Sequence, residues 1–256
     1  MKGLKEKLNK GEITVGSWIT LGHTAIAEIM AKAGFDWLVI DMEHSAICMH
    51  EAQQLIQTIE LSGNTPLVRV GVNDPLIIKR VMDAGAHGVI VPMVNSKEDA
   101  IRAVEAVKYP PSGKRGVGLA RAQGYGLDFQ GYKQWVNKNS VVIVQIEHVD
   151  AIKNLEDILG VDGIDGSIIG PYDLSASIGY PGEFERKAVK DLIGSYVERC
   201  GKLGKSAGFH VVDPDPGKFN KKIKEGFNFL AFGFDALFLG TACRDGLSTI
   251  KKERPR

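Results

Sequence analysis

Two carboxylates stand at the ends of two successive apolar runs in the middle of the sequence. The run VVIVQIE ends in Glu147, and the run GIDGSIIGPYD ends in Asp173. Between them, apolar residues recur at three- and four-residue steps, which is the period of one helix face. The pattern predicts a strand, a helix and a second, parallel strand. The carboxyl ends of both strands, with the two carboxylates, would then meet at one edge of the sheet.

Two carboxylates that are close together and both ionised require a cation between them. Oxygen ligands suit Mg²⁺ or Mn²⁺ better than zinc, which favours nitrogen and sulfur. Glu147 and Asp173 are therefore predicted metal ligands. The alternative is that they only cap the following helices, and for Asp173 the sequence Asp-Leu-Ser-Ala does resemble a helix start.

Charged residues close other apolar runs as well. The second run ends in Asp41, Glu43 and His44, and the third carries Arg69 near its end. An ion is costly to bury without a partner, so we expect these side chains to act in a site. His44 is the candidate general base, with a hydrogen-bonded structural histidine as the alternative. Arg69 could instead be a structural ion-pair partner.

These residues need a scaffold that brings several strand ends together. Eight apolar runs begin at Thr14, Trp37, Pro66, Gly88, Val141, Gly163, Lys205 and Asn228. Helices are expected between them at residues 24–32, 49–61, 74–84 and 96–107, with Asp74 and Ser96 as caps. Runs rich in Val and Ile are typical of parallel strands covered by helices. The order predicts an α/β fold, a (β/α)₈ TIM barrel, with a doubly wound sheet as the rival.

Length and composition agree with one barrel domain over residues 1–256. The 32 Lys and Arg nearly balance the 31 Asp and Glu, so we expect a small-molecule ligand and no nucleic acid. Three cysteines without a Cys-x-x-Cys motif indicate a reducing compartment. The amino terminus lacks the apolar core of a secretory signal, and no apolar run could span a membrane. The expected location is the cytoplasm.

The segment at residues 109–140 is long for a barrel connection, so it is expected to be functional, an interface or a plain surface excursion. Its basic residues Lys114, Arg115 and Arg121 could hold an anionic substrate or could be solvated. A Schiff-base aldolase needs a lysine in the pocket, yet no run ends in Lys, and Lys205 opens its strand. Metal-dependent chemistry is favoured. His87, His148 and His210 receive no role.

Several sequence blocks together resemble the metal-dependent 2-oxo-3-deoxy acid aldolases, a family that includes 4-hydroxy-2-oxoheptanedioate aldolase and 2-dehydro-3-deoxyglucarate aldolase. The blocks, in order, are FDWLVIDMEH, PLVRV with NDP, VPMV, YPPSGKRGVG, VQIE and IGPYDLSASIGYPG. Six blocks in the right order are more specific than any one of them. The resemblance implies a (β/α)₈ barrel that exchanges helices between subunits in a hexamer, a trimer of dimers.

The resemblance also implies a divalent ion, Mg²⁺ or Mn²⁺ with Co²⁺ as a third candidate, bound by Glu147 and Asp173. The partner would be a 2-oxo acid substrate, held by Gln145 and by the backbone near Gly170 and Tyr172. A large Tyr172 departs from the small residue that is common there and would reshape the pocket.

By the same resemblance, His44 would be the base, Asp83 would raise its basicity from the same or a neighbouring subunit, and Arg69 would stabilise the developing negative charge. Asp41, in the block of His44, counts among the catalytic residues. The implied activity is cleavage of a 4-hydroxy-2-oxo acid to pyruvate and an aldehyde through a pyruvate enolate. Two alternatives remain, a lyase acting on acyl-CoA esters and a barrel that binds 2-oxo acids without turnover.

Overall fold

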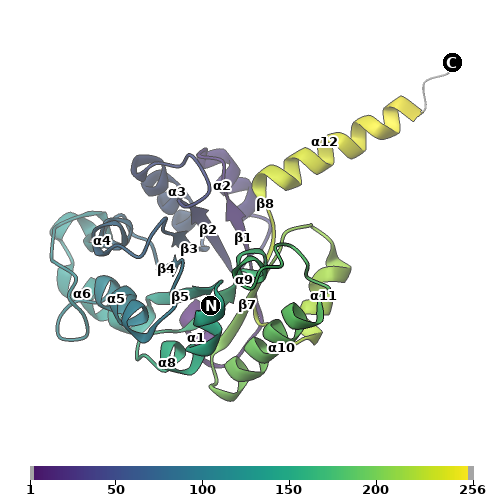
Figure 1. The fold of residues 1–256 in the computed structure, drawn as a ribbon. Helices are drawn as coiled ribbons and strands as arrows, with labels where there is room; N and C mark the ends of the chain where they lie inside the picture. Colours follow the sequence, from purple (N-terminus) through teal and green to yellow (C-terminus); the bar gives the residue numbers. More distant parts are fainter. Residues whose placement is uncertain (1–2, 253–256) are drawn as a thin grey trace.

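The computed structural model describes residues 3–252. Residues 1–2 and 253–256, the two ends of the expected domain, lie outside the described residues. Within that range, eight parallel strands form a closed barrel in chain order (Figure 1). They are β1 (Thr14–Ile19), β2 (Trp37–Asp41), β3 (Thr65–Arg69), β4 (Gly88–Val91), β5 (Val141–Ile146), β6 (Gly166–Ile169), β7 (Ser206–Val211) and β8 (Phe229–Phe234). The predicted barrel is confirmed, and the open doubly wound sheet is excluded.

Helices cover the barrel between successive strands, α1 precedes the first strand, and α12 follows the last strand and projects away from the barrel (Figure 1). They are α1 (Leu4–Asn9), α2 (Thr24–Ala31), α3 (Met49–Leu61), α4 (Pro75–Asp83), α5 (Lys97–Val107), the 3₁₀ helix η1 (Arg121–Gly126), α6 (Phe129–Asn139), α7 (Val149–Lys153), α8 (Leu155–Leu159), α9 (Pro171–Ser177), α10 (Lys187–Lys202), α11 (Pro216–Lys224) and α12 (Asp235–Lys252). The four helices expected from the first half of the sequence are present within one residue of their predicted limits.

The predicted caps are also present. The side chain of Asp74 accepts hydrogen bonds from the backbone N–H groups of Leu76 and Ile77 at the start of α4. Ser96 and Asp99 exchange side-chain and backbone hydrogen bonds at the start of α5. These caps satisfy N–H groups that have no acceptor within the helix.

The helix expected between β5 and β6 is broken in two. Asn154 separates α7 from α8 with a backbone of φ −93° and ψ 15°, outside the helical range. Its side-chain amide donates to the backbone oxygen of Asn95 at 2.8 Å, across to the preceding β/α unit. The apolar periodicity continues through the break, which is why the sequence alone indicated one helix.

Aromatic rings fill the interior of the barrel at the amino ends of the strands. Trp37 stacks on Phe229 with ring centroids 4.2 Å apart. A side-chain carbon on Gly16 would lie 2.0 Å from the Trp37 ring, so only glycine leaves room for this indole. Helix α1, to which the sequence analysis gave no element, buries Leu4 and Leu8 in the same cluster.

The segment at residues 109–140 packs beside the amino ends of the strands. The helix α6 contributes Tyr132 and Val136 to a small apolar cluster with Tyr109. The Arg115 side chain is fully buried there and forms an ion pair with Asp83. Its guanidinium lies 4.6 Å from the centroid of the Tyr109 ring and donates to the Tyr132 hydroxyl.

The basic residues of this segment were expected either to hold an anionic substrate or to be solvated. Neither expectation describes all three of them. Arg115 is buried rather than solvated. It lies at the amino ends of the strands, away from the mouth of the barrel, which is formed by the carboxyl ends of the strands. Arg121 forms an ion pair with Glu60, and hydrogen bonds from His87 and then Arg121 lower the pKa of Glu60 to about 2. Lys114 is exposed, as the second alternative expected.

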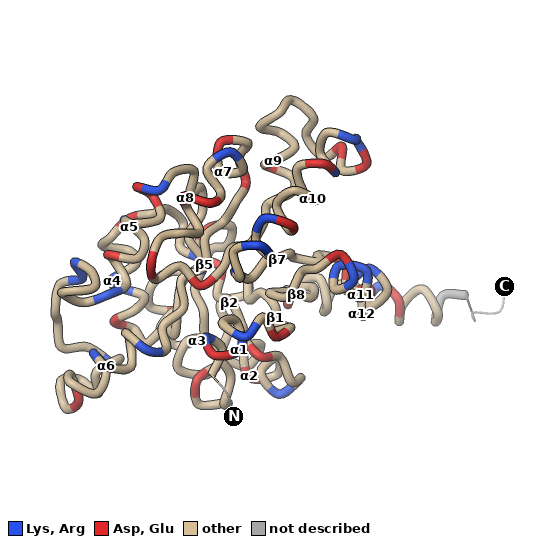
Figure 2. The backbone as a smooth tube through the Cα atoms, turned by 90° about the horizontal axis from the view of Figure 1, so that it is seen from below, with Lys and Arg blue, Asp and Glu red and all other residues tan. Residues whose placement is uncertain are grey.

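The surface carries mixed charge. Figure 2 shows acidic and basic residues interspersed along the backbone, with several lysines close together at α11. Among the described residues, no helix is both long enough and apolar enough to cross a lipid bilayer.

We predict that Arg115→Met lowers the free energy of unfolding by about 3 kcal/mol, because it leaves the carboxylate of Asp83 without its cation. The control is Lys114→Met, which removes an exposed cation next to it in the sequence and is expected to cost less than about 1 kcal/mol. Urea unfolding of both variants measures the difference. Equal stability of the two variants would contradict the assignment of Arg115 as a structural ion-pair residue.

Candidate active site

Arg69 and Asp41 form the centre of the polar mouth. They are register partners on β3 and β2. Arg69 Nη2 donates to Asp41 Oδ2 at 2.6 Å and Nε donates to Oδ1 at 3.0 Å, a two-point contact. Burial alone would raise the pKa of Asp41, but the hydrogen bonds and charge of Arg69 outweigh burial and hold that pKa below its usual range.

Asp41 also fixes the loop that follows β2. Its Oδ1 accepts from the backbone N–H groups of Glu43 at 3.0 Å and His44 at 3.2 Å. The carboxylate thus orients both the guanidinium and the loop that carries His44. Both oxygens of Asp41 therefore accept hydrogen bonds from within the protein.

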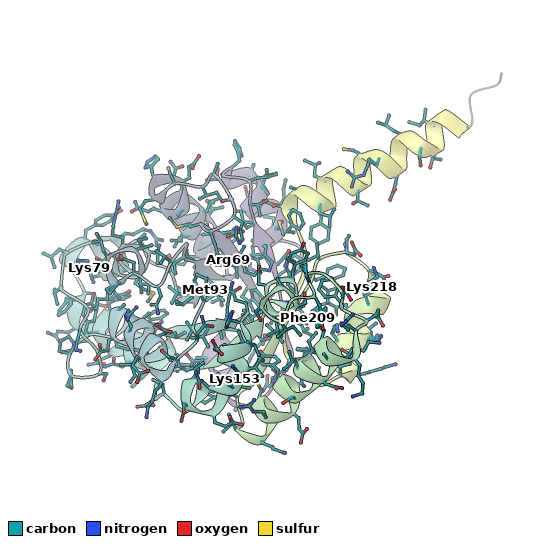
Figure 3. The ribbon with its side chains drawn as sticks, viewed as in Figure 1. Arg69, Lys79, Met93, Lys153, Phe209 and Lys218 are labelled. Carbon is teal, nitrogen blue, oxygen red and sulfur yellow. The ribbon has the colours of Figure 1, made fainter. Side chains whose placement is uncertain are left out.

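The guanidinium of Arg69 reaches three further groups. It lies 4.4 Å from the centroid of the Trp18 ring, where a cation is attracted to the aromatic face. Nη1 is 3.2 Å from Glu43 Oε2 and 3.4 Å from Gln145 Oε1. Figure 3 shows Arg69 and Met93 toward the barrel axis, whereas Lys79, Lys153 and Lys218 lie on the outer helices. Arg69 is therefore a fixed cation inside the mouth.

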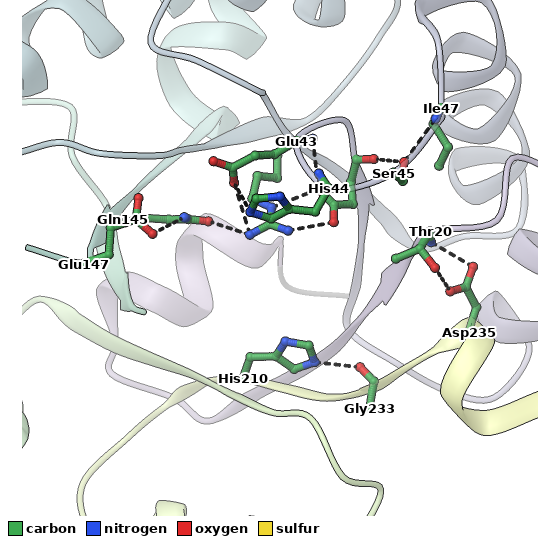
Figure 4. Close-up of polar contacts among 12 residues, drawn as sticks. Thr20, Glu43, His44, Ser45, Ile47, Gln145, Glu147, His210, Gly233 and Asp235 are labelled. Atoms are coloured by element: carbon green, nitrogen blue, oxygen red, sulfur yellow. Dashed lines mark hydrogen bonds and ion pairs between the residues drawn. The ribbon is translucent and has the colours of Figure 1, made fainter. Parts of the chain in front are cut away.

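Glu147 is held by donors on both of its oxygens. The backbone N–H of Met93 donates to Oε1 at 2.7 Å. Gln145 Nε2 donates to Oε2 at 2.9 Å, as Figure 4 shows. Burial raises the pKa of Glu147, and the negative charge of Asp173 adds to that rise while the two donors oppose it. Met93 has a positive φ of 52°, an uncommon backbone state for a side chain of this size.

Glu147 and Asp173 face one space beside Gly170. A side-chain carbon on Gly170 would lie 3.1 Å from Glu147 Oε2 and 3.8 Å from Asp173 Oδ2. Asp173 lies in the first turn of α9 and not on the strand itself, yet the short β6 to α9 connection brings it to Glu147. The structure brings the two predicted ligands together.

The donor set has the chemistry that a hard cation requires. Both groups offer oxygen only, and in the described part of the chain no cluster of three or more His, Cys, Asp and Glu side chains forms a metal cage. Two carboxylates leave several coordination positions for water and for substrate oxygens, as Mg²⁺ sites usually do.

Gly170 and Tyr172, the substrate-binding residues expected at the start of α9, have different surroundings. The Gly170 N–H donates to the Ile146 backbone oxygen, so it is not available to a substrate. The absence of a side chain at Gly170 leaves space beside Glu147. Tyr172 is 59% exposed at the rim and packs edge-on against Phe184 at 6.5 Å between ring centroids. Its side chain borders the approach to the site.

His44 and Asp83 do not meet within one chain. The His44 side chain is 70% exposed, with Nε2 3.7 Å from Glu43 Oε2. Burial and then the charge of Glu147 raise the pKa of Glu43, while Arg69 opposes the rise. Asp83 ends α4 at the amino ends of the strands, where it pairs with Arg115. Within a single subunit, the carboxylate beside His44 is Glu43.

His210 is a mouth residue to which the sequence analysis gave no role. It lies near the end of β7 with its ring 5.4 Å from that of Trp18, and its Nε2 is 2.9 Å from the Gly233 oxygen (Figure 4). Burial lowers the pKa of His210 to about 4, and the charge of Arg69 adds to that effect. The sequence does indicate the position of His210, because GFH closes an apolar run as DMEH and QIEH do.

Charged and polar groups at the carboxyl ends of a closed parallel barrel define an enzyme of the (β/α)₈ class. The model of the family described as HpcH/HpaI aldolase/citrate lyase matches residues 14–241, and the chain belongs to that family. It is therefore a carbon–carbon lyase of the aldolase type.

Relatives of this chain match it over nearly their whole length. It is 38% identical to the 2-keto-3-deoxy-L-rhamnonate aldolase of Escherichia coli K12, over 98% of this chain and 95% of that protein. The crystal structure of an HpcH/HpaI aldolase from Desulfitobacterium hafniense has a TM-score of 0.90 at 32% identity, covering 100% of this chain and 98% of that one. A family member from Burkholderia cenocepacia has a TM-score of 0.91 at 30% identity, covering 97% and 98%.

We predict that Gly170→Ala lowers aldolase turnover by about 10²-fold, because the added carbon would lie 2.9 Å from Glu147 Cβ and displace that carboxylate. The control is Gly194→Ala in α10, where the added carbon meets nothing within 4 Å. Turnover and thermal unfolding are measured for both variants. Full turnover in Gly170→Ala would show that the space beside Gly170 is not used.

Proposed function

We propose that this chain cleaves a 4-hydroxy-2-oxo acid to pyruvate and an aldehyde, with a divalent metal ion. The observation that carries the proposal is the pair of oxygen ligands, Glu147 and Asp173, which face one space beside Gly170 within the mouth that also holds Arg69. The E. coli relative is named for a 2-keto-3-deoxy acid, which supports the same substrate class here.

Glu147 and Asp173 would hold Mg²⁺ or Mn²⁺, with Co²⁺ as a third candidate. When bound, the ion supplies a Lewis acid for the negative charge that develops on the ketone oxygen of the substrate. Gln145 and the Met93 N–H keep the Glu147 carboxylate in place through its two oxygens. The protein's share of this step is to hold the two ligands in fixed positions.

The other residues of the mouth have separate roles in the proposed cleavage. Arg69, held by Asp41, provides a fixed positive charge near the developing enolate. His44 is exposed enough to receive the proton of the C4 hydroxyl. The N–H groups of Tyr172 and Asp173 begin α9 and have no acceptor within that helix, so they can bind the carboxylate of the substrate.

We predict that Glu147→Ala and Asp173→Ala each abolish metal-dependent pyruvate release, because removing one of two carboxylates weakens the binding of the ion and shifts its position. Arg69→Ala is expected to lower turnover by about 10²- to 10³-fold while Mn²⁺ affinity changes far less, because Arg69 stabilises charge in the reaction. Pyruvate release from 4-hydroxy-2-oxo acids, with Mn²⁺ binding measured by calorimetry, separates these effects. Normal activity of Asp173→Ala after exhaustive chelation would refute the metal assignment.

We also propose a homohexamer in which α12 packs on a neighbouring subunit. Figure 1 shows α12 leaving the barrel at β8 and projecting away from it. Leu239, Leu247 and Ile250 are each more than half exposed, and their spacing places them on one helix face. In such an assembly, Asp83 of one subunit could reach His44 of another, which a single chain does not allow.

The expected result for the double variant Leu247→Asp and Ile250→Asp is a smaller assembly, because two charges would be buried at the contact. Ser248→Asp places a charge about half a turn from Leu239 and serves as the control. Sedimentation velocity measures the size of each variant. If the double variant keeps the assembly of the unmodified chain, the apolar face of α12 is not an interface.

We place this activity in the cytoplasm. Cys48 and Cys243 are exposed, Cys200 is buried, and all three are free thiols. Exposed thiols are typical of proteins kept in a reducing compartment.

A further inference from the structure

A groove runs along the outside of the barrel between α10 and α11. It encloses a volume of about 1060 Å³. Its floor includes Phe209 of β7, which packs edge-on against Phe227 with ring centroids 5.1 Å apart. In Figure 3, Phe209 lies toward α11, the helix that carries Lys218. The groove is large enough to hold a small molecule.

The wall of the barrel separates this groove from the candidate active site. Successive side chains of a strand point to opposite faces. Phe209 points outward to the groove, whereas the ring of His210 lies 5.4 Å from that of Trp18 in the mouth. Arg69 and Glu147 do not line the groove. A ligand bound there would therefore leave the catalytic groups free.

The two long walls of the groove differ in chemical character. The α10 wall presents Ile193 and Val197 beside the aromatic floor. The α11 wall presents Lys218, Lys221 and Lys222, whose spacing of three and four residues places them on one helix face. Figure 2 shows these lysines close together on α11. The groove is thus apolar along one side and basic along the other.

The basic wall has more cations than carboxylates. Lys218 pairs with Asp213 at 2.5 Å, and Lys222 pairs with Glu225 at 2.7 Å. Lys221 is 76% exposed and lies 4.0 Å from the same Glu225. Three lysines therefore share two carboxylates. The acids of the opposite wall pair with lysines of their own, Glu185 with Lys190 and Glu198 with Lys202.

We propose that this groove binds an amphipathic carboxylate, a molecule with one anionic head group and an extended apolar body. The head group pairs with Lys221, and the body lies on Phe209 and Phe227. Residues 190–198 of α10 rise about 12 Å, a length that suits a medium-length acyl chain. An uncharged lipid would leave Lys221 without an anion, and a small polar anion would leave the aromatic floor uncovered.

The site does not depend on the proposed aldolase activity, so binding is measured on the full chain without metal or pyruvate. The probes are butanoate, octanoate and octan-1-ol, followed by titration calorimetry. Octanoate is expected to bind at least tenfold more tightly than butanoate, because each methylene that leaves water strengthens binding by up to about fourfold. Octan-1-ol, which lacks the charge, is expected to bind about fivefold more weakly than octanoate.

A charge reversal tests the basic wall. The double variant Lys218→Glu and Lys221→Glu is expected to weaken octanoate binding about tenfold and to leave octan-1-ol binding unchanged. A change in the fold would weaken both probes alike. The matched control is Lys79→Glu with Lys153→Glu, which makes the same change of charge on the outer helices α4 and α7 (Figure 3). The control is expected to bind octanoate as the unmodified chain does.

A second variant tests the apolar wall. Ile193→Asp places a carboxylate beside the floor of the groove, so it is expected to weaken octanoate binding at least tenfold. Thermal unfolding checks that this variant is folded. If it is not, the comparison of octanoate with butanoate on the unmodified chain still tests the same wall.

Four results would overturn the proposal. Octanoate could bind no more tightly than butanoate, or equally well to the Lys218 and Lys221 double variant and to its control. Pyruvate with Mn²⁺ could displace octanoate, which would place the probe in the mouth. Octanoate could bind to the Leu247→Asp and Ile250→Asp variant but not to the unmodified chain, which would mean that a second copy fills the groove. Failure of pyruvate release would refute the proposed function alone.

Discussion

The two-point contact between Arg69 and Asp41 is the interaction on which the mouth depends. A cation this deep in the barrel is stable only with a partner, and Asp41 is its register partner on the neighbouring strand. The same carboxylate accepts two backbone N–H groups from the loop of His44. The position of the cation, the path of the loop and the packing on Trp18 are therefore coupled.

Further carboxylates lie close to Arg69 in the same mouth, with Glu43 Oε2 3.2 Å from Nη1. Glu43 and Glu147 both have a raised pKa, mainly through burial, and each also carries the effect of a neighbouring carboxylate. Such a group of acids favours the binding of a positive ion. The strained backbone of Met93 fits this picture, because it directs an N–H onto Glu147 and strain of this kind gathers at functional sites.

Local patterns in the sequence were sufficient to predict the strands, most helices and the positions of Glu147 and Asp173. A strand that ends in a charged residue keeps that residue at the mouth of any parallel barrel, so Glu147 and Arg69 could be placed without coordinates. The contacts of Arg115 and His210 could not be predicted. Their surroundings depend on partners distant in sequence, Asp83 for the first and the Gly233 carbonyl for the second. The break at Asn154 likewise needs Asn95.

The buried Arg115 and its aromatic surroundings lie at the end of the barrel opposite the carboxylates. This buried polar network is thus remote from the proposed site. Evolution can then exchange rim residues such as Tyr172 with little penalty to folding, and descendants of one ancestral barrel can diverge in the aldehydes they accept while keeping a common chemistry.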